Sequence, residues 1–232
     1  MSETVPAIPT QTRLEPESRG LFISFEGGEA VGKSTQIAAL TRKFESLGRN
    51  VVLTREPGGT DPFGVQVRQL VQHGVDLNPK AEALLYAADR SYHVATKIRP
   101  ALAAGSVVIT DRYLDSSVAY QGGGRDLGND VYDLSLWATN GLLPDVTILL
   151  DADPVQALAR REGATDRIEA EPLAFHQAVR SRYLQLAKEN PQRFVVIDAT
   201  GDIQTVSEQI WQAISEKAAA LLSATEPGGG TR

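Results

Sequence analysis

The chain has 232 residues, of which 42% are hydrophobic, enough to build a sizeable buried core in one or two domains. Its 23 Lys and Arg residues against 29 Asp and Glu residues leave a net charge of −6, which argues against a protein held on nucleic acid or anionic lipid by bulk charge. With no cysteine and only three histidines, disulfides, thiolate chemistry and a dedicated zinc cage are not expected.

The two ends of the chain differ in composition from its middle. Residues 1–19 mix Glu, Pro, Thr and Ser, and residues 224–232 contain Pro-Gly-Gly-Gly, so both are predicted to be disordered extensions of a single domain at 20–223. The N-terminus does not read as a signal peptide, and no apolar run approaches the roughly 18 residues that a membrane span needs. No membrane association and a cytoplasmic location are therefore expected.

Five short runs rich in β-branched residues predict strands. Their nearly continuous hydrophobicity is typical of a parallel sheet that is buried on both faces, and the segments between them are long enough for crossover helices. We therefore predict an α/β fold with a doubly wound, five-stranded parallel sheet flanked by helices. The predicted strands are Leu21–Phe25, Val51–Leu53, Val107–Ile109, Val146–Leu150 and Phe194–Ile197.

Several of the intervening helices carry start signals. Asn78-Pro79 and Asp153-Pro154 each place an N-cap residue before a proline, and the second helix is expected to run to Gly163. A last helix is predicted from about Ile203, where apolar residues recur at three- and four-residue spacing. Gly122–Gly124 is expected to be a plain loop, with a flexible hinge as the alternative.

A phosphate-binding loop follows the first predicted strand. The segment Gly27-Gly28-Glu29-Ala30-Val31-Gly32-Lys33-Ser34 matches the pattern G-x-x-x-x-G-K-[ST], and a helical pattern begins at Thr35. Its backbone N–H groups and the helix N-terminus are expected to hold a nucleotide β-phosphate, with Lys33 reaching the β- and γ-phosphates and the Ser34 hydroxyl binding Mg²⁺. A chance match is the alternative, and a P-loop by itself does not say what is done with the nucleotide.

Two arginines follow the second and third predicted strands. Arg55 begins the run Arg55-Glu56-Pro57-Gly58-Gly59-Thr60, and Arg112 lies in Asp111-Arg112-Tyr113. Each alone could be an exposed charge that closes a loop. Because both come at the sheet edge where α/β proteins bind ligands, next to a P-loop, together they favour a second phosphate site.

At this point the chain resembles the thymidylate kinase family, the P-loop enzymes that phosphorylate thymidine monophosphate. The resemblance covers nearly everything from Leu21 to Leu222. It is carried by the P-loop and by four further segments, Phe25-Glu26-Gly27, Arg55–Thr60, Asp111-Arg112-Tyr113 and Ser116–Gly122, to which Asp166–Glu169 adds a match.

The resemblance implies roles for residues around the acceptor nucleotide, dTMP. Arg55 and Arg112 are expected to hold its phosphate, and Glu29 to contact the region of the deoxyribose 3′-hydroxyl, so that Glu29 needs no charged partner. Ser117, Tyr120 and Gln121 look like further base and sugar contacts, with the tyrosine crowding the ribose 2′ side.

Tyr86 and Arg90 resemble the residues that stack on thymine and hydrogen-bond it, although the family usually has Phe at the first position. Since they are spaced i and i+4 on one predicted helix, a ring and a guanidinium can address one planar base together. The alternative is a core aromatic residue beside a solvated charge.

The segment near 159–170 resembles an arginine-bearing lid that closes over ATP. Arg160, Arg161 and Arg167 are the candidates for stabilising the transferring phosphoryl group, because the variable P-loop positions contain no basic residue. A basic helix C-terminus that favours the helix dipole is the alternative for Arg160 and Arg161.

Two departures from the family pattern stand out. Ala30 replaces a common glycine, which would strain the loop if the position requires a positive φ, and Glu162 stands in the lid where some relatives carry another arginine. Asp111 is expected to organise Mg²⁺ or its waters, or else to fix Arg112. Adenine is expected near Asp198-Ala199-Thr200.

The predicted reaction is direct in-line transfer of the γ-phosphoryl group of MgATP to dTMP, giving dTDP and ADP in the synthesis of dTTP. The acceptor phosphate is already an anion near neutral pH, so no general base is required. A homodimer is expected from the resemblance. The alternatives are another nucleoside or nucleoside-monophosphate kinase and, from a different class, a nucleotide-binding module without turnover; a nucleic-acid motor is disfavoured by the charge.

Overall fold

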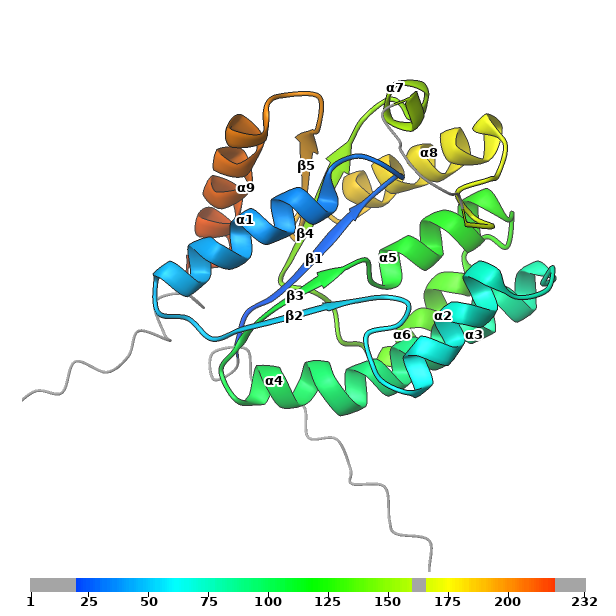
Figure 1. Ribbon diagram of the computed structural model, residues 1–232, viewed down its shortest axis with the longest axis horizontal. Coiled ribbons are helices and arrows are strands. Elements are labelled where there is room, and N and C mark those ends of the chain that lie inside the picture. The colour runs from blue at the N-terminus through cyan, green and yellow to red at the C-terminus, as the bar shows by residue number, and fades with distance from the viewer. Residues whose placement is uncertain (1–19, 160–165, 220–232) are drawn as a thin grey trace, which may run out of the picture.

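The computed structural model describes residues 20–159 and 166–219. In this part of the chain, five parallel strands form one sheet in the order β2-β3-β1-β4-β5 (Figure 1). This confirms the predicted fold class and all five strands, several of which extend one or two residues further. Their bounds are β1 Phe22–Gly27, β2 Val51–Arg55, β3 Val107–Asp111, β4 Val146–Asp151 and β5 Phe194–Asp198.

The register brings the carboxyl ends of three strands to one edge of the sheet. Phe25 in β1 and Arg55 in β2 both lie opposite Asp111, the last residue of β3. Because all strands are parallel, the loops that follow them open toward the same side. The P-loop and the turns carrying the two predicted phosphate-binding arginines therefore converge.

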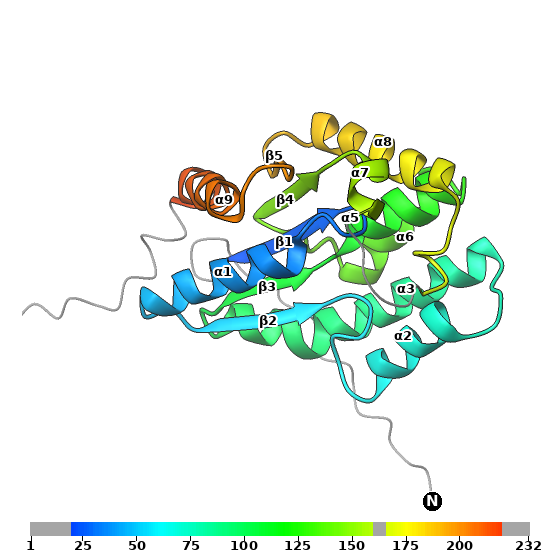
Figure 2. The ribbon, with the colours of Figure 1, turned by 45° about the horizontal axis from the view of Figure 1, so that its top comes forward.

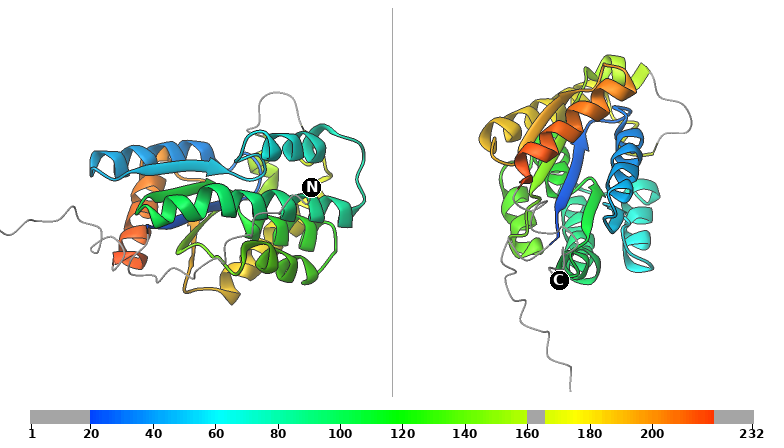
Figure 3. Two further views of the ribbon diagram at one scale, coloured as in Figure 1. Left: turned by 90° about the horizontal axis from the view of Figure 1, so that it is seen from below. Right: turned by 90° about the vertical axis from the view of Figure 1, so that its left-hand side faces the viewer.

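Helices cover both faces of the sheet (Figure 3). Some join end to end: α3, η2 and α4 follow one another without a break, as do α5 and η3. In the described residues their bounds are α1 Lys33–Ser46, α2 Phe63–His73, α3 Pro79–His93, η2 Val94–Ile98, α4 Arg99–Ala103, α5 Leu114–Ser117, η3 Val118–Gly124, α6 Asp130–Thr139, α7 Pro154–Ala159, α8 Leu173–Glu189 and α9 Ile203–Lys217.

The predicted helix starts form as the sequence indicates. Asn78 Oδ1 accepts a hydrogen bond from the Ala81 N–H at 3.0 Å, and Asp153 Oδ1 accepts one from the Val155 N–H at 2.9 Å. The described part of α7 ends at Ala159, so its predicted continuation to Gly163 lies outside the described residues. The last helix begins at Ile203 as predicted.

Alternate residues of β1 point into two separate hydrophobic cores. Ile23 and Phe25 pack on one face against α1 and α9, while Phe22 packs on the other face against residues of η2, α5 and α8. This double burial explains the continuous apolar character of the strands. Helices α2, α3 and α6 extend beyond the sheet, where α3 packs against both α2 and α6 (Figure 2).

The prediction of a loop at Gly122–Gly124 is wrong, since these residues are the end of the π-helical segment η3. The helix continues because it packs closely on α8. A Cβ atom on Gly123 would lie 2.8 Å from Cβ of Arg182, and one on Gly124 would lie 2.5 Å from the Phe175 ring. These glycines therefore serve a close helix approach rather than a turn.

The division into one domain with two extensions stays a prediction, because the segments 1–19 and 224–232 lie outside the described residues. Among the described helices, none combines the length and the apolar character that crossing a membrane requires.

Candidate active site

The P-loop connects β1 to α1 at the centre of the sheet. Gly32, with φ of +89°, is the N-cap of α1, so the first N–H groups of the helix face the loop. The Lys33 ammonium is buried and donates hydrogen bonds to the carbonyl oxygens of Gly27 at 3.4 Å and Gly28 at 2.7 Å. Burial lowers the pKa of Lys33, and the neighbouring charge of Arg112 lowers it further.

Ala30 has φ of +57°, in the left-handed region. The sequence-based concern about this position is therefore confirmed: a residue with a Cβ occupies a conformation that glycine adopts without steric cost.

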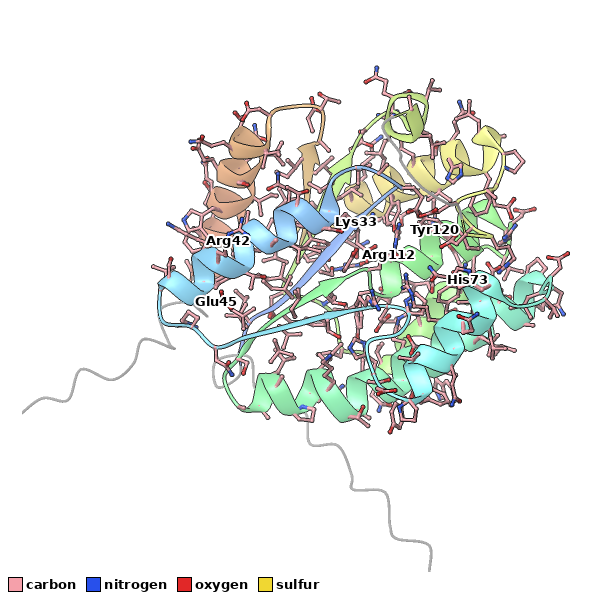
Figure 4. All side chains as sticks on the ribbon, viewed as in Figure 1. Lys33, Arg42, Glu45, His73, Arg112 and Tyr120 are labelled. Carbon is pink, nitrogen blue, oxygen red and sulfur yellow. The ribbon has the colours of Figure 1, made fainter. Side chains whose placement is uncertain are left out.

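A cavity of about 600 Å³ opens beside this loop at the carboxyl edge of the sheet. It brings together residues from β2, α3, the turn after β3, α5 and η3, together with the segment after 165. The predicted site residues that line it are Glu29, Ala30, Val31, Gly32, Lys33, Ser34, Thr35, Arg55, Tyr86, Arg90, Asp111, Arg112, Ser117, Tyr120 and Gln121. Figure 4 shows Lys33, Arg112 and Tyr120 in this region, whereas Arg42 and Glu45 lie further along α1.

Arg112 occupies the wall of the cavity next to the P-loop. Its Nη1 donates to the Gly27 carbonyl at 2.9 Å, and its Nη2 donates to Glu29 Oε1 at 2.6 Å and to the Tyr120 hydroxyl at 3.1 Å. The guanidinium also lies over the Tyr120 ring, 4.9 Å from its centroid. The second predicted phosphate-binding residue, Arg55, also lines the cavity, is exposed and forms no ion pair with the described residues.

Glu29 is paired with Arg112, so the expectation that it has no charged partner is wrong. The Tyr120 hydroxyl donates to the same carboxylate oxygen at 2.6 Å. Burial by itself raises the pKa of Glu29, but the positive charges of Arg112 and Lys33 outweigh burial and lower it from 4.5 to about 2. The carboxylate is therefore ionised at neutral pH and can accept a hydrogen bond from a sugar hydroxyl.

Tyr86 and Arg90 both line the cavity from α3, at the predicted i and i+4 spacing. The alternative of a solvated charge is wrong for Arg90, which is 1% exposed. Its guanidinium donates to Glu56 Oε2 at 2.7 Å, to Ser135 Oγ at 3.2 Å and to Ser117 Oγ at 3.0 Å. These contacts fix the plane of the guanidinium at the cavity wall.

Sequence reasoning assigned no role to Glu56, which holds Arg90 in place. Its other carboxylate oxygen lies 2.9 Å from Nδ1 of His93, whose Nε2 is 2.7 Å from the Thr54 hydroxyl. A sequence signal for a role of Glu56 was present, because Glu56 is part of the family-like run Arg55–Thr60. Its partners could not be read from the sequence, since Arg90 and His93 lie on α3, more than thirty residues away.

The further predicted base and sugar contacts, Ser117, Tyr120 and Gln121, come from the continuous helix α5–η3. Ser117 accepts from Arg90, and Gln121 Nε2 donates to Glu82 Oε1 at 2.8 Å. Glu82, which is fully buried on α3, was also missed. It further accepts from Arg125 at 3.3 and 3.4 Å and pairs with Arg167.

Arg167 does not line the cavity. It bonds Glu82, and its Nη2 also donates to the Val71 carbonyl at 2.9 Å. In this conformation the Arg167 side chain holds the segment after 165 against α2 and α3. Its catalytic role stays a prediction. Arg160 and Arg161, like Glu162, lie outside the described residues.

Ser34 and Asp111 meet at the cavity's P-loop side and fit the expected divalent cation. The Oδ1 atom of Asp111 is buried without a hydrogen-bond partner, and the Ser34 side chain is exposed toward the same space. No side-chain hydrogen bond joins Asp111 to Arg112. Residues 20–159 and 166–219 contain no group of three His, Cys, Asp or Glu side chains suited to a metal ion, as is usual where Mg²⁺ is held chiefly by phosphates and water.

The start of α9 lies beside the P-loop helix α1, because Gln36 of α1 donates to the carbonyl of Ile203, the first residue of α9, at 3.1 Å. Asp198, the last residue of β5, accepts from the Thr200 N–H and hydroxyl at 2.9 and 2.7 Å. The placement of adenine there stays a prediction.

Together, a P-loop at the centre of a parallel sheet and a cavity beside it that Arg55, Arg90 and Arg112 line are the features of a P-loop nucleotide phosphotransferase. The sequence model of the thymidylate kinase family matches residues 25–210. The chain belongs to the thymidylate kinase family.

Curated relatives agree over most of the chain. A thymidylate kinase of Leifsonia xyli subsp. xyli is 58% identical over 196 residues, covering 82% of this chain and 92% of the relative. Thymidylate kinases of Bifidobacterium longum subsp. infantis and Deinococcus radiodurans are 54% and 46% identical, covering 88% and 86% of this chain and 88% and 98% of the relatives. The chain is thus a dTMP kinase, a transferase of dTDP and dTTP synthesis, and the alternative functions are not favoured.

Proposed function

We propose that this enzyme transfers the γ-phosphoryl group of ATP directly to the phosphate of dTMP within the 600 Å³ cavity. The bond from the γ-phosphorus to the β–γ bridging oxygen breaks, and a bond to an oxygen of the dTMP phosphate forms, which gives ADP and dTDP. The single observation that carries the proposal is the position of Arg112, which bonds the P-loop and lines the same cavity as Tyr86 and Arg90.

The acceptor is held by its phosphate, sugar and base in turn. Arg112 and Arg55, which both line the cavity, bind the phosphate as paired guanidinium groups. The Glu29 carboxylate accepts from the 3′-hydroxyl, and the Tyr120 hydroxyl, bonded to Glu29, lies next to the sugar. Tyr86 stacks on thymine, while Arg90, Ser117 and Gln121 supply hydrogen bonds around the base.

The donor is held by the P-loop. Backbone N–H groups of Gly28–Ser34 surround its β-phosphate, and the Lys33 ammonium exchanges its present carbonyl partners for phosphate oxygens. Ser34 and Asp111 would hold Mg²⁺, which when bound neutralises charge on the β- and γ-phosphates. Since the acceptor phosphate is ionised near neutral pH, positioning and charge stabilisation suffice, and no residue acts as a general base.

The lid arginines complete the site in this proposal. Arg160 and Arg161, which follow α7, supply positive charge to the transferring group, and an arginine in such a role contributes roughly 10³ to 10⁵ in rate. Arg167 joins them on closure or remains the anchor of the segment at Glu82.

We also propose a homodimer and a cytoplasmic location. The dimer is supported by exposed apolar side chains on helices that pack side by side, Trp137 of α6 at 79% exposure and Leu84 of α3 at 57%. The location is supported by the substrates, because ATP and dTMP are intracellular nucleotides.

The test is an assay of ADP release with MgATP and a panel of acceptors: dTMP, dUMP, UMP, dCMP, AMP, GMP and thymidine. Selective turnover of dTMP is expected. Arg112→Ala should lower kcat/KM for dTMP about 10²- to 10³-fold, because it leaves the acceptor phosphate and Glu29 without their charged partner.

The matched control is Arg42→Ala, which removes an exposed arginine of α1 outside the cavity and should leave kcat/KM within twofold. Preference for another monophosphate would overturn the base-site assignment, and an unchanged Arg112→Ala enzyme would overturn the phosphate site.

A further inference from the structure

Glu26 is a buried carboxylate that the proposed mechanism does not use. It is the penultimate residue of β1, directly before the P-loop, and is 0% exposed. A buried carboxylate is costly unless its hydrogen bonds are made. All of the hydrogen bonds made by its side chain run to the turn that carries Arg112 or to side chains that contact Arg112.

The first contact of Glu26 fixes the backbone around Arg112. Arg112 has φ of +68°, in the left-handed region, where a residue with a Cβ atom is strained. The next N–H group, that of Tyr113, donates to Glu26 Oε1 at 2.8 Å. The Arg112 N–H donates to the Phe25 carbonyl at 2.9 Å, and the Thr110 hydroxyl donates to the Arg112 carbonyl at 2.8 Å. Of these three contacts, only Glu26 brings a charge.

Glu26 also acts on the Arg112 guanidinium, through the hydroxyl groups of Ser116 and Tyr183. Glu26 Oε2 accepts from Ser116 Oγ at 2.6 Å and from the Tyr183 hydroxyl at 2.9 Å. Both hydroxyl oxygens also accept from Arg112 Nη1, each at 3.3 Å. An ionised carboxylate can only accept, so both hydroxyl protons point to Glu26 and both oxygens present lone pairs to Arg112.

A protonated or amide side chain at this position would reverse that order. Its N–H or O–H would donate to Ser116 or Tyr183, and the displaced hydroxyl proton would turn toward the other hydroxyl, 2.8 Å away, or toward the guanidinium. Arg112 would then lose an acceptor or meet a donor. The ionisation of Glu26 is thus coupled to the orientation of the guanidinium.

Titratable groups from four parts of the fold surround Glu26. Arg112 lies on the turn after β3, Lys33 on α1, and Asp115 on α5, where it is paired with Arg193 at 2.6 and 2.8 Å. Tyr183 approaches from α8. Burial, and after it the negative charge of Asp115, raise the pKa of Glu26 from 4.5 to about 7, against the opposing effects of Ser116 and Arg112.

We propose that Glu26 is a positioning residue for phosphoryl transfer: its carboxylate, by holding the Tyr113 N–H and both hydroxyls, orients Arg112 toward the acceptor phosphate. The inference rests on the proposed phosphate-binding role of Arg112. It predicts that Glu26 affects binding of the monophosphate and not of ATP.

The test is steady-state kinetics of Glu26→Gln against the unsubstituted enzyme, with dTMP and ATP varied separately between pH 6 and pH 8.5. At pH 8.5 the substitution should raise KM for dTMP about tenfold and leave KM for ATP within twofold. At pH 6, where Glu26 is largely protonated in the unsubstituted enzyme, the ratio of the two dTMP KM values should fall below about threefold. Taking this ratio cancels the ionisation of dTMP itself, whose phosphate has a pKa near 6.

The proposal would be overturned if the ratio of the variant's KM for dTMP to that of the unsubstituted enzyme were constant across this pH range. It would also be overturned if the substitution raised KM for ATP as much as KM for dTMP. Tyr183→Phe keeps the carboxylate and removes one relay hydroxyl, so it should raise KM for dTMP about threefold even if Glu26→Gln does not fold. Its control is Tyr92→Phe, which removes a hydroxyl from a 43% exposed side chain and should have no effect. An unchanged KM in Tyr183→Phe would contradict the relay.

Arg112→Ala separates this inference from the proposed function. If Arg112 binds the phosphate and Glu26 acts through it, Glu26→Gln added to Arg112→Ala should cause no further rise in KM for dTMP. If Arg112→Ala alone leaves KM unchanged, the proposed function fails. If only the arginine variant has an effect, the inference about Glu26 fails alone.

Discussion

Backbone strain at this site is concentrated in two residues with side chains. Ala30 in the P-loop and Arg112 after β3 both have positive φ; Ala30 follows Glu29 in the chain, and Arg112 is the ion-pair partner of Glu29. Such conformations persist where surrounding contacts enforce them, and they cluster at functional sites. For Arg112 the enforcing contacts are the three described above. At Ala30 the Cβ itself creates the strain, and glycine would remove it.

Ala30→Gly should therefore stabilise the ligand-free enzyme. Relief of the left-handed strain, partly offset by the greater freedom of glycine in the unfolded chain, should raise the free energy of unfolding by about 0.5–1 kcal/mol. Urea denaturation measures this change.

Asp126→Gly is the control, because Asp126 has φ of +59° on an exposed turn outside the cavity, and aspartate tolerates this region better than alanine. A smaller gain is expected there. A loss of stability in Ala30→Gly would contradict the assignment of strain to this residue.

The element that organises the acceptor site is helix α3. Residues 82, 86 and 90 follow one another at i, i+4 spacing, so Glu82, Tyr86 and Arg90 lie along one helix face. Arg90 is held by Glu56 from the loop after β2, and Glu82 binds the ends of two other segments, η3 through Gln121 and the segment after 165 through Arg167. One helix face thus sets the positions of three neighbouring segments.

Glu82→Gln should weaken the fold and the base site together. The substitution leaves Arg167 without its carboxylate and Arg125 with Glu171 as its remaining one, so the free energy of unfolding should fall by roughly 1–3 kcal/mol. KM for dTMP should rise because a single amide oxygen then has to serve the donors of Gln121, Arg125 and Arg167. Urea denaturation and steady-state kinetics measure the two effects.

Glu45→Gln, on the exposed side of α1, provides the matched control and should change stability by less than about 0.5 kcal/mol. If the two variants were equally stable, Glu82 would not be the anchor of these segments.

At the scale of the whole molecule, the helices beyond the sheet leave an apolar surface. Trp137 and Leu84 are more than half exposed on α6 and α3, which pack against each other. Each large apolar side chain that becomes buried contributes roughly 1.5–3 kcal/mol. A face of this kind, on α6 and on α3, which carries Tyr86 and Arg90, suits a second copy of the chain.

Light scattering should therefore give about 50 kDa, twice the 25.0 kDa of one chain. Trp137→Lys should shift the mass toward 25.0 kDa, since it places a charge in the interface. Ile203→Lys makes the same charge change at a 63% exposed apolar residue on α9 and should leave the dimer intact. A Trp137→Lys protein that stays dimeric would move the interface elsewhere.

The features that the sequence by itself determined are those encoded by contiguous residues. The P-loop from Gly27 to Ser34, the five strands and the caps at Asn78 and Asp153 are all marked by short local patterns. The cap hydrogen bonds also close within three residues. The resemblance raised strain at Ala30 as a possibility that depended on the backbone angle, and the structure supplies that angle. The second phosphate site, inferred from two arginines after parallel strands, stays a proposal.

The tertiary structure alone decided which distant side chains meet. Glu29 and Arg112 are 83 residues apart, and Arg90 is buried because Glu56 and Ser135 come to it from other segments. The helical state of Gly122–Gly124 depends on the approach of α8. The hydrogen bonds of Glu26 depend on the fold bringing Ser116 and Tyr183 to it. These outcomes follow from strand order and from the burial of charge, since a buried ionisable group takes its partner from whatever element the fold packs against it.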